Sequence, residues 1–321
     1  MKAITAHRYG SPDVLELQEV DKPVVNDDEV LVRVRAASVN PRDWHIMRGL
    51  PYIVRPLLRK LRRGVLGSDV AGQVEAVGKD VTRYHPGDAV FAHVLTGGFA
   101  EYTCVPEQFL GLKPATLTFE QAAAVPLAAL TALQGLRDHG RIHSEQKVLI
   151  IGASGGVGTF AVQIAKSFGA HVTGVCSTRN VDMVRSIGAD DVIDYTREDF
   201  TQNGQKYDLI LQLAGTRSPS DCRRALTSKG TLLLSSGDSS GRWIGPLDRI
   251  IKAALLSPFV SQRLAAFEAK RSKEDLQVLK ELIEAGKVMP VIDRTYSLSE
   301  VPEAIRYLEE GHARGKVVVA V

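Results

Sequence analysis

The spacing of apolar residues divides the chain into two parts. In the first third, short β-type runs separated by turn residues predict strands over 29–36, 72–77, 88–93 and 99–105. This pattern is typical of a compact β-rich domain. From residue 147 onward, short apolar runs alternate with stretches of helical spacing. Such alternation predicts βαβ units and therefore a parallel, doubly wound sheet.

The second half is predicted in more detail from the same pattern. A helix is expected over 181–187, and strands are expected over 147–151, 171–176, 192–193, 209–213 and 230–235. An alanine- and leucine-rich stretch over 118–137 links the two parts and is predicted to be helical, with Pro126 ending or kinking one helix.

The end of the chain returns to a β-rich pattern. A helix over 273–285 is expected to end at Gly286, because glycine readily adopts the left-handed conformation that closes a helix. Strands near 291–296 and 316–321 surround a further helix, and they carry no phosphate-binding motif. We expect this segment to complete the first domain.

A glycine-rich turn, GASGGVG, follows the strand predicted over 147–151 and precedes an amphipathic helix. Ala153, Gly155 and Gly158 occupy the small-residue positions of the pattern G-x-G-x-x-G, with alanine in the first. Such a turn lets strand and helix pack closely, while the free N–H groups that open the helix face an anion. The succession predicts a site for the pyrophosphate of a dinucleotide. The alternative is a glycine-rich turn without a ligand.

The residues after the next strand bear on the choice of cofactor. An Asp or Glu about 20 residues beyond the turn would hold the ribose 2′-hydroxyl of NAD. Instead, the strand over 171–176 runs into Ser177, Thr178 and Arg179. Two hydroxyls and a guanidinium are suited to binding and neutralising a 2′-phosphate. The sequence therefore predicts NADPH rather than NADH, with a solvated helix-start residue as the alternative for Arg179.

Composition and charge narrow the class of partner. A chain of 321 residues exceeds the usual size of a single core, so two domains are expected. The net charge of +3 is too small to indicate nucleic-acid binding, which leaves small molecules as the expected partners. Three cysteines without a C-x-x-C pair fit a reducing compartment. With no apolar run approaching 18 residues or so, no integral membrane segment and a cytoplasmic location are expected.

One segment departs from this ordinary composition. Residues 55–63 concentrate five basic residues beside three leucines. The segment could contact an acidic surface or lipid headgroups, or it could be a solvated basic loop.

Signatures along nearly the whole chain point to one family. They are MKAITAHRYGSPDVLEL, AASVNPRDW, GSDVAGQVEAVG, GDAVFA, GASGGVG, IGADDVIDY and GHARGKVVV. Together they resemble the medium-chain dehydrogenase/reductase superfamily, specifically its zinc-independent NADPH quinone oxidoreductase branch. The resemblance implies an α/β fold with a GroES-like, β-rich catalytic domain over 1–123, completed by 287–321. A Rossmann-type NADPH-binding domain with a doubly wound parallel sheet would span 124–286.

The resemblance also indicates whether the chain is expected to bind a catalytic metal ion. Superfamily members that use catalytic zinc carry a Cys where Asn40 stands and a His–Glu pair where Ser68 and Asp69 stand. Asn and Ser do not replace these zinc ligands, and the four-cysteine structural lobe is missing as well. His45, His85 and His93 are among the scattered histidines, and no two of them show ligand spacing on one element. We therefore expect no metal and no alcohol dehydrogenase activity.

The expected chemistry follows from the missing metal. Without a metal to polarise a carbonyl group, NADPH would deliver hydride to an acceptor that is already electron-poor, a quinone or an α,β-unsaturated carbonyl. The protein would gain rate mainly by orienting the nicotinamide against this acceptor. The alternative is an NADPH-binding regulatory or structural protein with little turnover, because a superfamily fold does not secure catalysis. A homodimer is the default assembly.

The resemblance implies the following site residues. Asn40 and Tyr52 would face the nicotinamide and Thr131 would lie near its amide, as the catalytic residues. Asn40 could equally be a turn residue and Tyr52 part of the core, while Asp43 could cap the following helix or pair with an arginine. The cofactor residues are Ser154, Gly155, Gly156 and Val157 at the pyrophosphate, Ser177 and Arg179 at the 2′-phosphate, Tyr195 beside the adenosine phosphate, Ala214 and Ser236 at the carboxyl edge of the sheet, and Ala313, Arg314 and Lys316 near the nicotinamide half.

Aromatic residues supply a last hypothesis. Trp243, Phe259 and Phe267 lie in an irregular helical stretch after a Ser/Gly-rich segment. They could wall an acceptor pocket, since ligand sites are mostly apolar and aromatic, or they could pack in the core.

Overall fold

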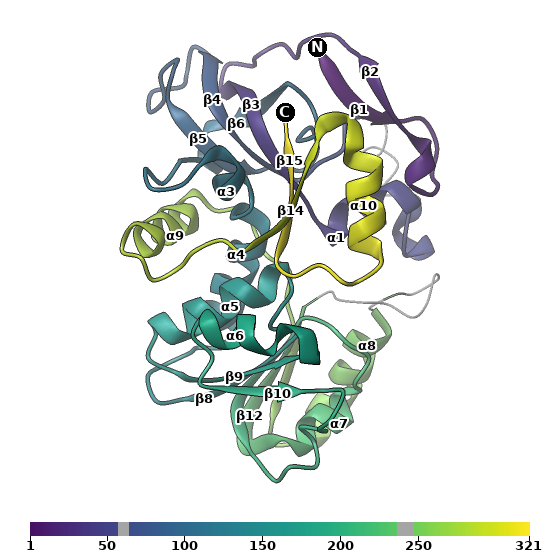
Figure 1. Cartoon of the computed structure of the whole chain (residues 1–321), viewed down its shortest axis with the longest axis vertical. Coiled ribbons are helices and arrows are strands. Elements are labelled where there is room, and N and C mark those ends of the chain that lie inside the picture. Colours follow the sequence, from purple (N-terminus) through teal and green to yellow (C-terminus); the bar gives the residue numbers. More distant parts are fainter. Residues whose placement is uncertain (57–63, 236–244, 246) are drawn as a thin grey trace. The chain divides into compact units, whose positions relative to one another are not determined.

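The structure, a computed structural model, describes residues 1–321 except for 57–63, 236–244 and 246 (Figure 1). It divides into two compact units. The first unit contains residues 1–130, 271–286 and 290–321, and the second contains 131–270 and 287–289. The division differs from the expected boundaries mainly because residues 271–286 lie in the first unit.

The first unit is built on a seven-stranded sheet in the order β14-β15-β3-β4-β5-β7, with β6 paired to β3 (Figure 1). The strands are β3 (Glu29–Val39), β4 (Asp69–Val77), β5 (Ala89–His93), β6 (Tyr102–Pro106), β7 (Leu110–Leu112), β14 (Ile292–Ser297) and β15 (Lys316–Ala320). A separate antiparallel pair is formed by β1 (Lys2–Ala6) and β2 (Leu15–Glu19). The C-terminal strands therefore complete the sheet of the first unit, as the sequence predicts.

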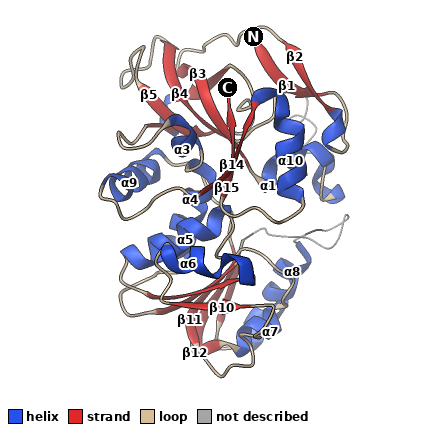
Figure 2. Ribbon diagram, in the orientation of Figure 1, coloured by secondary structure: helices blue, strands red, loops and turns tan. Residues whose placement is uncertain are grey.

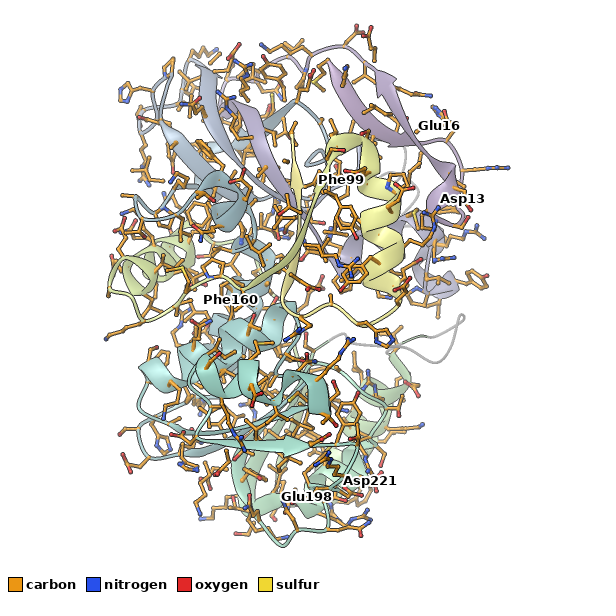
Figure 3. All side chains as sticks on the ribbon, viewed as in Figure 1. Asp13, Glu16, Phe99, Phe160, Glu198 and Asp221 are labelled. Atoms are coloured by element: carbon orange, nitrogen blue, oxygen red, sulfur yellow. The ribbon has the colours of Figure 1, made fainter. Side chains whose placement is uncertain are left out.

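Two apolar clusters hold this sheet. One contains Val32, Val70 and Val90. The other joins the sheet to α1 (Pro41–Arg48) and α10 (Val301–Glu309), and its members include Phe99 and Ile305, which are fully buried. Figure 3 shows Phe99 beside α10. Burying each side chain of this size contributes about 1.5–3 kcal/mol to stability. The clusters therefore hold the strands whose ends carry the polar residues described below.

Helix α9 (Lys273–Glu284) belongs to the first unit because of its packing. Its side chain Leu276 lies over Gly111 in β7, where an added Cβ would come within 3.2 Å of the Leu276 Cβ. The Glu284 carboxylate accepts the Ala115 N–H at 3.0 Å. Spacing along the chain predicted the helix and its end at Gly286, whose φ is +69°. It did not reveal that the helix packs on the β-rich unit.

The helical link lies where it was predicted. It is divided into α3 (Phe119–Ala123) and α4 (Pro126–Gln134), and a short π-helix (Gly135–His139) follows. Pro126 is the first residue of α4, a position at which the missing N–H costs no helical hydrogen bond. The predicted break at Pro126 is therefore confirmed.

The second unit is a six-stranded sheet in which every neighbouring pair is parallel. Its order is β10-β9-β8-β11-β12-β13. The strands are β8 (Lys147–Ile151), β9 (His171–Cys176), β10 (Asp191–Asp194), β11 (Tyr207–Gln212), β12 (Leu226–Leu234) and β13 (Arg263–Ala266). The predicted doubly wound parallel sheet is confirmed.

Helices cover both faces of this sheet (Figure 2). On one face lie α5 (Gly156–Ser167) and α6 (Val181–Ser186), and on the other lie α7 (Pro219–Arg224) and α8 (Leu247–Leu256). The chain changes face between β8 and β11, which are neighbours in the sheet. In folds of this kind, ligands bind outside the carboxyl ends of the strands at such a switch point.

The glycine turn between β8 and α5 is packed tightly at two glycines and loosely at a third. Gly152 has φ +87°, and a Cβ on Gly158 would lie only 2.0 Å from the Gly152 carbonyl oxygen. A Cβ on Gly155 would meet nothing closer than 3.5 Å. Gly158 thus allows the close approach of helix and strand, and the fully buried Phe160 further along the helix anchors α5 (Figure 3). Gly155 leaves space.

This difference predicts opposite effects for two alanine substitutions. Gly158→Ala drives a methyl group into backbone and should lower the free energy of unfolding by about 1–3 kcal/mol, as overpacking does. The matched control Gly155→Ala should change it by less than about 0.5 kcal/mol. Urea unfolding of the two variants measures both values, and equal destabilisation would contradict the assigned roles.

Candidate functional site

The second unit presents a helix N-terminus at the switch point. The residues Gly156, Val157 and Gly158 open α5, and the first amides of a helix have no partner within the helix. The Gly155 N–H closes the turn on the Gly152 carbonyl at 3.1 Å. Ala214, after β11, lies against Gly152, where an added Cβ would be 2.8 Å from the Ala214 Cβ. The two loops at the switch point are therefore in contact, and the first amides of a helix at such a position favour the binding of an anion.

The loop after β9 is tied to the glycine turn by one side chain. The Asn180 Nδ2 donates to the Ser154 Oγ at 3.0 Å and to the Ser177 Oγ at 3.2 Å. Asn180 is 4% exposed, while both serines are half-buried. Sequence reasoning missed Asn180 because an Asn before a helix is ordinarily explained as a cap. The expected pyrophosphate and 2′-phosphate residues Ser154 and Ser177 thus lie on either side of a shared amide group.

Residues at the predicted 2′-phosphate site differ in whether their side chains are bonded within the protein or exposed to solvent. The Thr178 hydroxyl donates to Asp194 at 2.5 Å, so it holds the loop to β10. This hydrogen bond lowers the pKa of Asp194. Arg179 is exposed. Tyr195 donates its backbone N–H to the Cys176 carbonyl at 3.1 Å, and its side chain is 63% exposed. The sequence-predicted residues Ser177, Arg179 and Tyr195 therefore all reach the surface of the second unit.

A separate polar cluster lies at one edge of the sheet in the first unit. The antiparallel register sets Asp69, at the start of β4, opposite both Ser38 in β3 and His93 at the end of β5. On the other side of β3, Val317 in β15 is opposite Val39. Side chains at these strand ends are therefore neighbours although they are far apart in sequence.

Asn40, Asp69 and Lys316 form the centre of this cluster. The Lys316 Nζ donates to the Asn40 Oδ1 at 2.6 Å, and the Asn40 Nδ2 donates to the Asp69 Oδ2 at 2.9 Å. The Lys316 ammonium also lies 3.7 Å from the Asp69 carboxylate. All three side chains are at most 3% exposed. Burial lowers the pKa of Lys316, and the Asp69 carboxylate limits that fall.

Asp69 collects further hydrogen bonds. Its carboxylate accepts the Ser38 hydroxyl at 3.0 Å and the Leu127 N–H at 2.9 Å. The His93 Nδ1 lies 3.4 Å from it and 2.7 Å from the Ser68 carbonyl oxygen. Burial alone would raise the pKa of Asp69, but the His93 contact and the Lys316 charge outweigh it and hold the pKa below its usual range. A buried carboxylate is tolerable only with such partners.

Asp43 is the second buried carboxylate of the cluster. It accepts the Asn40 N–H at 2.7 Å and the Ser68 hydroxyl. It thereby caps α1, which confirms the alternative considered for it. Burial, and next the negative charge of Asp69, raise its pKa from 3.8 to about 6, although the two hydrogen bonds oppose this. Of the two carboxylates, Asp69 therefore carries the more persistent charge.

The predicted catalytic residues have different surroundings. Asn40 is 3% exposed, with both ends of its amide bonded inside the first unit. Tyr52 is half-buried in a short 3₁₀ turn (Tyr52–Val54), with the Arg55 guanidinium 5.5 Å from its ring. Thr131 in α4 is 7% exposed. Their catalytic roles stay predictions, and Lys316 has a place in the buried cluster that the sequence did not suggest.

The remaining candidates are distributed as follows. Phe267 is 8% exposed and stacks on His139 at 5.0 Å, so it packs in the core of the second unit. Phe259 is 84% exposed. Ala313 is half-buried, and Arg314 is exposed with its N–H bound to Asp293 at 2.9 Å. Trp243, Ser236 and most of the basic segment, 57–63, lie outside the described residues.

Two features are absent from the part of the chain that the structure describes. No group of three or more His, Cys, Asp or Glu side chains in this part is arranged to hold a metal ion. No helix among the same residues is long and apolar enough to cross a membrane. The cytoplasmic location and the homodimer stay predictions.

The raised pKa of Asp43 predicts a pH dependence of stability. Between pH 3.8 and about 6, the folded chain holds a proton on Asp43 that the unfolded chain has released, so stability falls as the pH rises through this window. Asp43→Asn removes this titration. The unfolding free energy of the wild type minus that of the variant should fall by up to about 3 kcal/mol over the window and then level off. Urea unfolding at several pH values measures it, and a constant difference would contradict the shift.

Comparison with known proteins gives consistent matches over the chain. A family model described as "Alcohol dehydrogenase GroES-like domain" matches residues 26–115, and one described as "Zinc-binding dehydrogenase" matches 187–319. The mitochondrial NAD(P)H oxidoreductase RTN4IP1 of Mus musculus is 37% identical, over 100% of this chain and 89% of that protein. The 2-methylene-furan-3-one reductase of Solanum lycopersicum is 35% identical, over 99% and 79% respectively.

A solved structure agrees with these relatives. The quinone oxidoreductase of Escherichia coli complexed with NADPH superposes with a TM-score of 0.88 at 25% identity, covering 100% of both chains. The likeness thus extends over both units: one family model matches part of the first unit, and the other matches parts of both. The family expected from the sequence motifs is confirmed: the chain belongs to the medium-chain dehydrogenase/reductase superfamily, in its quinone oxidoreductase branch.

Proposed function

We propose that the protein is an NADPH-dependent oxidoreductase that reduces a quinone or an α,β-unsaturated carbonyl compound without a metal ion. The observation that carries the proposal is the second unit's open glycine turn, joined through Asn180 to a loop that bears Ser177 and Arg179. The names of the relatives support the same chemistry, since they include an NAD(P)H oxidoreductase, an enone reductase and a quinone oxidoreductase complexed with NADPH.

The residues of the second unit fit this cofactor. Gly155 leaves space beside the turn, and the amides of Gly156 and Val157 lie at the positive end of the α5 dipole, which favours a pyrophosphate. Ser154 supplies a hydroxyl to the same group. Ser177 and the exposed Arg179 supply a hydroxyl and a guanidinium to the 2′-phosphate.

The cofactor, when bound, supplies a hydride to an acceptor that is already electron-poor. The chain's own contribution is to bind and orient the cofactor and to exclude water from the reacting pair. Within the first unit, the cluster around Asp69 holds the N-terminus of α1 in place through Asn40 and Asp43. We assign Asn40 this positioning role, because its amide bonds are already used inside the unit.

The first unit does not fit a zinc ion at the positions where zinc-using relatives bind it. The Asn40 amide is bonded at both ends, and the Ser68 hydroxyl donates to Asp43. The Lys316 ammonium lies 3.7 Å from Asp69 and would repel a divalent cation. Tight zinc sites use thiolate or imidazole ligands, and at positions 40 and 68 this chain carries an amide and a hydroxyl instead. The donor set therefore supports metal-independent reduction.

Activity should persist when metal ions are removed. With a quinone or an enone as acceptor, NADPH oxidation measured at 340 nm or so should keep its rate in excess chelator after prolonged dialysis, because the proposed reaction needs no Lewis acid. A zinc-dependent alcohol dehydrogenase assayed alongside serves as the control for chelation. Loss of activity that returns with added zinc would refute metal independence, and tight NADPH binding without turnover over a broad acceptor panel would favour a non-catalytic protein.

Cofactor preference should depend on Arg179. Arg179→Ala should weaken NADPH binding by about 10- to 100-fold while leaving NADH binding nearly unchanged, since the lost charge-assisted contact is to the extra phosphate. Arg224→Ala is the matched control, because that arginine lies on α7 and pairs with Asp221 at 2.8 Å. Titration calorimetry with both nucleotides gives the ratio. Equal weakening of both would refute the assignment.

A further inference from the structure

We propose that Asn180 is a positioning residue for the cofactor: its amide group donates to Ser154 and Ser177 and thereby turns both hydroxyl hydrogens toward the phosphate groups of NADPH. The inference rests on the proposed function, because it takes the ligand to be that nucleotide. It concerns one buried side chain that the family motifs do not single out.

The geometry places a single donor group between two loops. The Asn180 Nδ2 lies 3.0 Å from the Ser154 Oγ, in the glycine turn, and 3.2 Å from the Ser177 Oγ, after β9. An amide NH₂ carries two hydrogens, so it can donate to both oxygens at once. Asn180 is buried at 4% exposure, which excludes water as an easy substitute for either bond.

The direction of these bonds determines what the serines can do. A serine hydroxyl has one hydrogen, and its oxygen can accept from another group at the same time. Because Asn180 occupies an acceptor position of each oxygen, each hydroxyl hydrogen remains for another acceptor. Among the described residues, neither Ser154 nor Ser177 donates its hydroxyl hydrogen to a protein group. Phosphate oxygens accept hydrogen bonds only, so two donating hydroxyls match two phosphate groups.

The side-chain amide of Asn180 makes these two bonds in place of other hydrogen bonds that it could form. Asn180 occupies the N-cap position of α6, yet within the described chain its side chain accepts no capping hydrogen bond from the helix. Its Oδ1 is also buried without a hydrogen-bond partner among these residues. A cap is typically worth about 1 kcal/mol, and an unsatisfied buried acceptor costs more. The side chain therefore bonds to the two serines at a cost to the stability of its own helix.

The two serines serve different parts of the nucleotide. Ser154 lies at the predicted pyrophosphate site, which NADH and NADPH share, whereas Ser177 lies at the predicted 2′-phosphate site, which only NADPH fills. Asn180 should therefore affect both nucleotides and NADPH more strongly. Arg179, by contrast, should affect NADPH alone.

A double-mutant cycle tests this role. Asn180→Leu removes the two donated bonds at similar size, and Ser154→Ala and Ser177→Ala each remove one hydroxyl. We expect Asn180→Leu to weaken NADPH about 10- to 100-fold by titration calorimetry, and NADH less, as loss of oriented bonds to a charged group does. In the Asn180→Leu background, removing either hydroxyl should cost less than about 2-fold, although each should cost about 10-fold in the wild type.

Additive effects would overturn the proposal. If Asn180 only supported α6, the serine substitutions would keep their full effect in its absence, and both nucleotides would weaken equally. Ser186→Ala, on the same helix, is the matched control for a merely structural change, because its hydroxyl donates to Met183 within α6. Neither nucleotide's affinity should change in that variant.

Two further arms keep the test decisive. Asn180→Asp preserves the shape of the side chain, so it serves if the leucine variant does not fold. Its carboxylate accepts from the serines and turns their hydrogens inward, and it should weaken NADPH by about 100-fold or more. Wild-type affinity in that variant would overturn the proposal. A wild-type protein that binds no NADPH would overturn the proposed function as well, whereas additivity with intact NADPH binding overturns the role of Asn180 alone.

Discussion

The close approach of α5 to the end of β8 is the constraint on which the second unit depends. A Cβ on Gly158 would lie 2.0 Å from the Gly152 carbonyl oxygen, so helix and strand meet at a distance that no side chain at this position allows. That approach sets the first amides of α5 at the switch point of the parallel sheet, next to the loop that carries Ala214. The anion site that we propose is thus a consequence of packing, and Asn180 connects the glycine turn to the loop after β9.

The two units use polar groups in opposite ways. In the first unit, the amide of Asn40, the carboxylate of Asp69 and the ammonium of Lys316 satisfy one another out of contact with water. Such a network of mutually bonded polar groups fixes the strand ends. In the second unit, the hydroxyl oxygens of Ser154 and Ser177 accept from Asn180, and among the described residues neither hydroxyl donates to a protein group.

The features that could be predicted from the sequence are those set by a local pattern of residues. The strands β8 and β9 begin and end at the predicted residues, and Pro126 divides the helical link as expected, because apolar period and proline chemistry are local properties. Contacts between segments that are distant in the chain have no comparable pattern in the sequence. The packing of α9 on β7, the bond from Lys316 to Asn40 and the two bonds of Asn180 each join residues whose pairing depends on the folded sheet. Sequence reasoning therefore predicted the strands and the glycine turn, and it did not reveal these contacts between distant segments.

The most direct test of this account is a crystal structure of the protein grown with NADPH. The account predicts the pyrophosphate on the amides of Gly156 and Val157, and the 2′-phosphate between Ser177 and Arg179, with Asn180 still bonded to both serines. A nucleotide bound away from the glycine turn, or a metal ion held by Asn40 and Ser68, would contradict it.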